Sequence, residues 1–193
     1  KDHPQARILI LEKGILPQGA STKNAGFACF GSLSELIDDL KTHRPEEVYQ
    51  LVEKRWEGLA LLRKNLGDKP IDFQQNKGFE LCKTKEFFEA CISQKEDINQ
   101  LLRPIFKTDV FSVTENRFGF QKIHSQYITN NFEGQIDTGK MAAELLDKVQ
   151  QLGVKIFNGV SVEGYTDIGN QVDVHTSEIT FSTNKLFVAT NGF

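Results

Sequence analysis

Three short apolar runs along the chain have the composition of strands buried in a parallel sheet. They are Ile8 to Leu11, which Glu12 follows directly, Val154 to Phe157, and Leu186 to Ala189. Short runs of mainly apolar residues are typical of strands that are covered on both faces. We therefore predict that all three share one parallel sheet, with the first run beside the second.

Helix signals follow the first of these runs. Ser32-Leu-Ser-Glu35 matches a capping box at a helix start, and Pro45 is placed as the first residue of a long amphipathic helix that Gly67 ends. The spacing of apolar residues predicts a third amphipathic helix from Lys85 to Leu102. Between and after these helices lie β-like pieces at residues 78–83, 110–113 and 122–129, so the middle of the chain is predicted to be an α+β insertion.

The pattern changes after Gly134. Thr138 is placed to cap a helix from Gly139 to Leu152, which comes directly before the run at Val154 and so predicts a crossover connection of the parallel sheet. Alternating apolar and polar residues then predict a three-stranded antiparallel meander at residues 160–166, 171–176 and 178–182.

Composition narrows the possible functions. The chain has 193 residues, 39% of them hydrophobic, and a formal net charge of −3, which is ordinary for a globular protein. A mildly acidic chain lacks the clustered Lys and Arg that bind a phosphate backbone, so we expect no nucleic-acid partner. The aliphatic runs are far shorter than the ~20 residues of a membrane span, so no span is predicted.

Cysteine and histidine positions argue against a metal site. Cys29, Cys82 and Cys91 form no C-x-x-C pair and have no His at zinc-ligand spacing, and the four histidines stand alone. We expect no metal, and three free buried thiols in a reducing, cytoplasmic environment.

Glu12 is the most informative single residue. An acidic residue at the end of a parallel strand, before a glycine-containing loop, is where dinucleotide-binding folds hydrogen-bond the ribose hydroxyls. A strand that simply ends in a polar residue would look the same, so Glu12 alone leaves both interpretations open. A P-loop at Gly14 to Ser21 is excluded because Ala20 stands where the phosphate-binding lysine is required.

Several further motifs occur in a fixed order along the chain. They are Gly19-Ala-Ser-Thr-Lys-Asn-Ala-Gly26, Gly134-Gln-Ile-Asp-Thr138, Gly153-Val-Lys-Ile-Phe157 followed by Val162, and Phe187-Val-Ala-Thr-Asn-Gly192. In this combination, over essentially its whole length, the chain resembles the FAD-dependent D-amino-acid oxidase family. That family includes glycine, sarcosine and γ-glutamylputrescine oxidases and D-amino-acid dehydrogenase.

The resemblance implies an α/β fold with FAD as the cofactor: a Rossmann-like parallel sheet with an antiparallel meander and an inserted α+β substrate-side subdomain. It assigns Glu12 to the adenosine ribose and the backbone of Val162 to the adenine. Small residues in the loop would let backbone N–H groups approach the pyrophosphate and flavin closely. The implied cofactor-binding residues are Glu12, Lys13, Gly19, Ala20, Ser21, Asn24, Ala25, Gly26, Val162, Ala189, Thr190 and Gly192. No catalytic residue is implied.

By the same resemblance, residues 1–31 and 134–193 are an incomplete FAD-binding domain and residues 32–133 are the substrate-side subdomain. The family's first strand, its G-x-G-x-x-G fingerprint and its C-terminal half have no counterpart here. We therefore expect the chain to be roughly the middle of a longer enzyme, and to be inactive by itself.

The implied function is oxidation of a C–N bond in a small-molecule amino acid or amine by hydride transfer to flavin. The residues leave two alternatives open. One is a non-catalytic α+β ligand-binding or interaction module, in which Glu12 and the glycine loop only form turns of the chain. The other is an NAD-dependent dehydrogenase, which the meander between Phe157 and Leu186 disfavours. The sequence does not distinguish an oxidase from a dehydrogenase or specify an oligomeric state.

Overall fold

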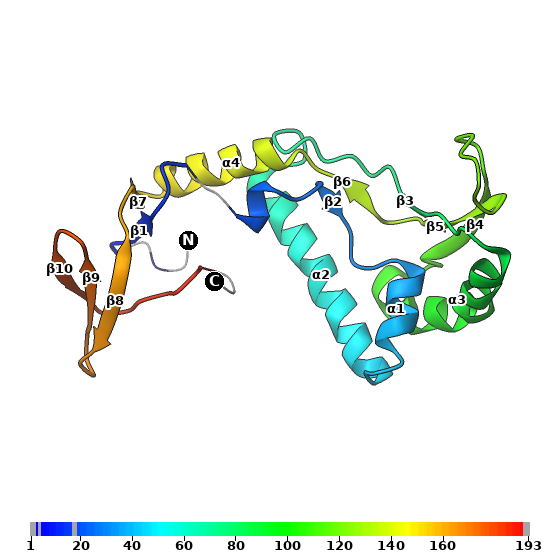
Figure 1. The fold of residues 1–193 in the computed structure, drawn as a ribbon, viewed down its shortest axis with the longest axis horizontal. Helices are drawn as coiled ribbons and strands as arrows, with labels where there is room; N and C mark the ends of the chain where they lie inside the picture. The colour runs from blue at the N-terminus through cyan, green and yellow to red at the C-terminus, as the bar shows by residue number, and fades with distance from the viewer. Residues whose placement is uncertain (1–2, 4, 17–18, 191–193) are drawn as a thin grey trace. The chain divides into compact units, whose positions relative to one another are not determined.

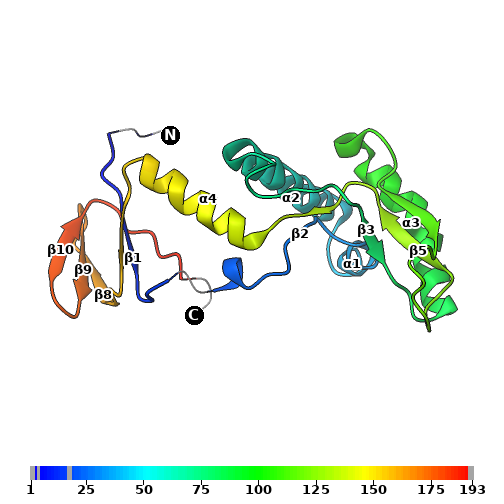
Figure 2. The ribbon, with the colours of Figure 1, turned by 90° about the horizontal axis from the view of Figure 1, so that it is seen from above.

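The computed structural model describes residue 3, residues 5–16 and residues 19–190. The chain divides into two compact units, one made of Lys1–Lys23 and Leu145–Phe193 and the other of Asn24–Glu144. Figures 1 and 2 show the helices and strands of both units in two views. Among the described residues, none of the helices combines the length and the hydrophobicity that a bilayer span requires.

The first unit contains a parallel pair of strands, β1 (Leu9–Glu12) and β7 (Lys155–Asn158). Their register pairs Leu9 with Lys155 and Glu12 with Asn158, so both strands end at the same edge. This confirms the prediction that the first two apolar runs are neighbours.

Helix α4 (Thr138–Gln151) precedes β7, as the crossover prediction requires. Its first turn is capped by Asp137 and not by Thr138, because the Lys140 N–H donates to Asp137 Oδ1 at 2.9 Å. Gly153, with a positive φ of 79°, lies between the helix and the strand.

The prediction of a third strand at Leu186–Ala189 is wrong for this structure, in which these residues form no strand. A strand exists only where a neighbour completes its hydrogen-bond ladder, and within the described residues β1 and β7 pair only with each other. Phe187 is 84% exposed and Val188 67% exposed. The expectation that the parallel strands are buried on both faces is also wrong, since Ile10 and Phe157 are 40% and 51% exposed.

The predicted antiparallel meander is confirmed. Strands β8 (Val162–Asp167), β9 (Val172–Thr176) and β10 (Thr180–Thr183) form a sheet in the order β10-β9-β8. His175 on the central strand contacts both neighbours: its Nε2 lies 2.9 Å from Thr166 Oγ1 and its Nδ1 lies 3.0 Å from Thr180 Oγ1.

Three helices in the second unit begin where the sequence predicts, two of them at predicted start signals. Ser32 Oγ accepts the Glu35 N–H at the start of α1 (Leu33–Asp39), and α2 (Pro45–Leu66) starts at its proline and ends at Gly67. Helix α3 (Lys85–Phe106) runs past its predicted end and through Pro104. The buried Phe106 side chain packs that last turn into the core, and Lys107 ends it in the left-handed conformation with a φ of 63°.

The strands of the second unit form two small antiparallel sheets. One has the order β3-β5-β4, built from β3 (Gly78–Glu80), β5 (Gln126–Asn130) and β4 (Phe111–Glu115) at the positions of the predicted β-like pieces. The other pairs β2 (Phe27–Ala28) with β6 (Gly134–Gln135), two strands too short to produce a sequence pattern. Helix α3 packs against both α1 and β4, as Figure 1 shows.

The main hydrophobic core lies in this second unit. Its aromatic centre is formed by Phe30, Trp56, Phe106 and Phe132, whose rings contact one another with centroid separations of 4.6 to 6.0 Å. The fully buried aliphatic residues around it include Leu33, Leu36, Val52, Ile98 and Leu102.

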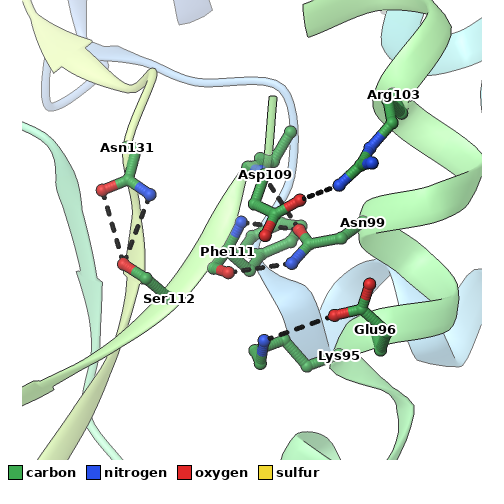
Figure 3. Close-up of polar contacts among 9 residues, drawn as sticks. Lys95, Glu96, Asn99, Arg103, Asp109, Phe111, Ser112 and Asn131 are labelled. Atoms are coloured by element: carbon green, nitrogen blue, oxygen red, sulfur yellow. Dashed lines mark hydrogen bonds and ion pairs between the residues drawn. The ribbon is translucent and has the colours of Figure 1, made fainter. Parts of the chain in front are cut away.

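One buried polar side chain joins helix α3 to strand β4. Asn99 is completely buried, and its Oδ1 accepts the N–H groups of Val110 and Phe111 at 3.1 and 2.8 Å, while its Nδ2 donates to the Phe111 carbonyl at 3.0 Å. Figure 3 shows this arrangement, with the Arg103–Asp109 ion pair beside it at 2.7 Å. The sequence reading did not identify Asn99 as an interior residue.

Candidate functional site

Glu12 and the chain that leads into Val162 meet at one edge of the parallel strand pair. The Glu12 carbonyl accepts the Val160 N–H at 3.0 Å, and the Gly14 carbonyl accepts the Gly159 N–H at 3.0 Å. The chain after β7 therefore folds back over the end of β1. Val162 follows two residues after Val160, which limits their Cα separation to about 7 Å. The structure thus brings Glu12 and Val162 to the same edge.

The Glu12 carboxylate is half-buried and held in place by its own turn. Its Oε1 accepts the Gly14 N–H at 2.7 Å. Within the described residues, its Oε2 receives no hydrogen bond. This leaves a carboxylate oxygen at the strand edge that can accept hydrogen bonds from vicinal hydroxyl groups.

The glycine loop spans the division between the two units. Gly19 precedes a 3₁₀ turn at Ala20–Thr22 in the first unit, while Asn24, Ala25 and Gly26 belong to the second. Asn24 Oδ1 accepts the Gly26 N–H at 2.9 Å. Gly26 has a φ of 79°, and a Cβ there would collide with the Ile136 carbonyl, so only glycine fits this position.

The positions of the other predicted cofactor residues say less about a binding site. Lys13 is exposed directly after Glu12, and Ala189 and Thr190 are exposed in a segment without regular structure. Gly192 lies outside the described residues. Within the first unit, the carboxylate of Glu12 and the small residues Gly19, Ala20 and Ser21 match in chemistry what a dinucleotide requires, namely an acceptor for ribose hydroxyls and backbone that can be approached closely.

A cavity of about 440 Å³ lies in the second unit, next to the β2–β6 pair. Its walls come from β2, the start of α1, β3, β4, β5 and β6. Phe27, Phe79 and Phe111 make part of its apolar lining, and Glu80 and Glu133 supply two carboxyl groups.

Glu80 is engaged with the start of helix α1. Its carboxylate accepts the Ser34 hydroxyl hydrogen, and its Oε2 accepts the Ser34 N–H at 3.3 Å. A carboxylate at a helix N-terminus satisfies N–H groups that have no partner within the helix, so Glu80 has a structural role here.

Glu133 is the second carboxyl group of the cavity, and it is half-buried. The pKa of Glu133 is raised from its ordinary 4.5 to about 7, mainly by burial. Hydrogen bonds from the backbone of Phe30 and Gly31 act against this rise, and the nearby carboxylates of Glu35 and Glu80 add to it. No ion pair among the described residues involves Glu133. The sequence reading missed this residue, because its neighbours in the cavity come from segments far away along the chain.

The cysteines differ from the prediction in one respect. Cys82 and Cys91 are free and buried, as expected, and burial raises the pKa of Cys82 to about 11. Cys29 is free but exposed. It follows the short strand β2, where alternate side chains point to opposite faces, so the flanking Ala28 and Phe30 are buried while Cys29 faces outward.

The crossover helix, the parallel strand pair and the meander place the chain among mixed α/β proteins. Within that class it belongs to the FAD dependent oxidoreductase family (DAO), whose family model matches residues 2–193. FAD is the cofactor of this family.

Solved structures share the fold at low sequence identity. Glycine oxidase from Bacillus cereus has a TM-score of 0.64 at 15% identity, covering 93% of this chain and 48% of that one. Glycine oxidase from Geobacillus kaustophilus has a TM-score of 0.62 at 18% identity, with 93% and 47% covered. L-amino acid deaminase from Proteus myxofaciens, in complex with anthranilate, has a TM-score of 0.62 at 17% identity, with 92% and 38% covered. The chain thus spans less than half the length of these three proteins. No curated protein matches the sequence.

Proposed function

We propose that the chain is part of a flavoenzyme that oxidises the C–N bond of an amino acid or amine. The observation that carries this proposal is the family match over residues 2–193, an FAD-dependent oxidoreductase family. The resemblance to glycine oxidases and to an L-amino acid deaminase supports small amino compounds as the substrate class.

In this proposal Glu12 holds the adenosine ribose through its Oε2, and the backbone at Val162 contacts the adenine. Gly19, Ala20, Ser21, Asn24, Ala25 and Gly26 follow the pyrophosphate and flavin, and Lys13, Ala189, Thr190 and Gly192 complete the contacts. The meeting of Glu12 and Val160 at one strand edge supports the first two assignments.

The bound flavin supplies the acceptor for a hydride from the carbon that bears the nitrogen. The nitrogen loses a proton in the same overall reaction, so the substrate becomes an imine that water hydrolyses to a carbonyl compound and ammonia or an amine. The protein's part is to orient that carbon and to receive the proton. We propose residues 32–133 as the substrate-side subdomain and residues 1–31 and 134–193 as the FAD-binding domain. The cavity of the second unit supports the first of these assignments.

A cytoplasmic location is part of the same proposal. The three cysteines are free, which suits a reducing compartment.

The test is anaerobic mixing of the full-length, flavin-loaded protein with a panel of primary amines, secondary amines and amino acids. Loss of the visible absorbance of oxidised flavin with one class, and none with the corresponding alcohols or hydroxy acids, is the expected result. A protein that binds no FAD would instead favour the non-catalytic module.

A further inference from the structure

Glu133 is a half-buried carboxyl group that forms no ion pair among the described residues, although Lys77 lines the same cavity. The carboxylates of Glu35 and Glu80 are near enough to raise the pKa of Glu133. Hydrogen bonds from the backbone of Phe30 and Gly31 offset part of the cost of burying this carboxylate, yet the pKa of Glu133 is still raised. A proton, or a cation from outside the chain, would offset the rest of that cost. The cavity beside it has room for such a cation.

The backbone holds this carboxyl group in a defined position. The Lys77 N–H donates to the Glu133 carbonyl at 2.9 Å, which ties the residue to the start of β3. At the next position, Gly78, a Cβ would collide with Glu133 Oε2. A glycine there lets the β3 backbone pack directly against the carboxyl group.

The cavity also lies next to the part of the glycine loop that belongs to the same unit. The Gly26 carbonyl accepts the Ile136 N–H at 2.8 Å, and the ladder continues with Phe27 opposite Gln135 and Ala28 opposite Gly134. Glu133 is the next residue along that strand. Gly26 and Glu133 are therefore separated by only about three strand positions, roughly 10 Å.

We propose that Glu133 receives the ammonium group of the substrate in this cavity and accepts its proton. The proposal rests on the proposed function and names a residue for the proton that C–N oxidation must release. In this step an N–H bond of the ammonium breaks, an O–H bond forms on the carboxylate, and a neutral amine and a neutral carboxylic acid result. No oxidant takes part in it.

The surroundings suit an organic ammonium ion. Phe27, Phe79 and Phe111 give the cavity aromatic walls against which a carbon chain can pack. Lys77, a lining residue, is the one cationic side chain on the wall, so with ionised carboxyl groups the lining carries a net negative charge. Among the described residues no group of three His, Cys, Asp or Glu side chains is arranged to hold a metal ion.

A non-oxidisable probe separates this proposal from the flavin chemistry. tert-Butylammonium has no hydrogen on the carbon that bears nitrogen, so it cannot donate a hydride, and tert-butanol is its neutral counterpart. Calorimetric titration of the flavin-loaded protein should show binding of tert-butylammonium, with an affinity that rises between about pH 6 and about pH 8 as Glu133 ionises. tert-Butanol should bind at least about tenfold more weakly.

Three variants test whether Glu133 is the group that binds the ammonium ion. Glu133→Gln should weaken tert-butylammonium binding at least about tenfold and remove its pH dependence. Gly78→Ala, which displaces the carboxyl group without removing it, should also weaken binding. Glu57→Gln, an exposed change on α2, should leave it unchanged. Circular dichroism checks that each variant is folded.

Equal affinity for the ammonium and the alcohol, or unchanged ammonium affinity in folded Glu133→Gln, would overturn the proposal. Neither result depends on flavin reduction. A protein that binds the probe through Glu133 but whose flavin no amine reduces would instead contradict the proposed function alone.

Discussion

The Val160 N–H donates to the carbonyl oxygen of Glu12 at 3.0 Å, which fixes the end of one parallel strand to the turn that follows the other. This bond places the Glu12 carboxylate and the start of β8 at a common edge. The edge is where the adenosine part of a dinucleotide would have to lie to touch both.

The first prediction tests the Glu12 carboxylate at that edge. Glu12→Ala should reduce FAD affinity about 10-fold to 100-fold, because charge-assisted hydrogen bonds to the ribose are lost. Flavin absorbance that remains with the protein after gel filtration measures the effect. Glu178→Gln, an exposed change in the β9–β10 turn, is the matched control and should retain its flavin. Equal flavin occupancy in Glu12→Ala and the control would contradict the ribose assignment.

A second prediction concerns the link between α3 and β4. Asn99→Ala removes the partner of two buried N–H groups and one buried carbonyl, so the free energy of unfolding should fall by about 2–4 kcal/mol. Asn131→Ala, which removes a half-buried contact with Ser112 in the same region (Figure 3), should cost less than about 1 kcal/mol. Chemical denaturation measures both values, and similar losses would show that the Asn99 bonds contribute little.

The third prediction follows from the raised pKa of Glu133. The folded protein holds this proton up to about pH 7, whereas the unfolded chain releases it near its ordinary pKa of 4.5. The contribution of Glu133 to the free energy of unfolding is therefore fully present below about pH 4.5, and it is lost as the pH rises to about 7. Glu133→Gln should be more stable than the wild type by about 1–3 kcal/mol at alkaline pH, with the difference vanishing in acid.

Denaturation midpoints across the pH range check this prediction. Glu57→Gln is again the control, and it should follow the wild-type pH dependence. A Glu133→Gln protein whose midpoint differs from that of the wild type by the same amount at every pH would show that the carboxyl group is not desolvated in the folded state.

The three thiols should differ in how fast they react with a thiol reagent. Cys29 is exposed, whereas Cys82 and Cys91 are buried. Burial raises the pKa of all three thiols, so their different exposure is what separates their reactivity. An aromatic disulfide reagent should therefore modify one thiol rapidly in the native protein and the other two only after denaturant is added. Cys29→Ser should abolish the rapid phase, and a rapid phase that persists in that variant would contradict the assignment.

Local signals in the sequence predicted the helices well. Ser32, Pro45 and Gly67 act on the backbone within one turn of themselves, so their effect is visible without knowledge of the tertiary structure. The pairing of β1 with β7 was also predictable, since a helix directly before an apolar run constrains the topology.

The features that the sequence did not reveal depend on contacts between distant segments. The expectation for Leu186–Ala189 failed because composition describes what a strand would bury, while a strand also needs a neighbour in its ladder. Glu133 is flanked by unremarkable residues, and its environment is created by Gly78 from β3 and by the β2–β6 pair. Its role could only be inferred once those segments were seen together.

Single-turnover analysis with a ¹⁵N-labelled primary amine or amino acid tests the central claim most directly. The full-length, flavin-loaded protein is reduced anaerobically by the labelled compound, and the ammonia and carbonyl product are then quantified. Oxidation at the C–N bond predicts one equivalent of labelled ammonia and one of carbonyl compound for each flavin reduced. Flavin reduction without release of labelled ammonia, or no reduction by any amino compound that binds, would contradict it.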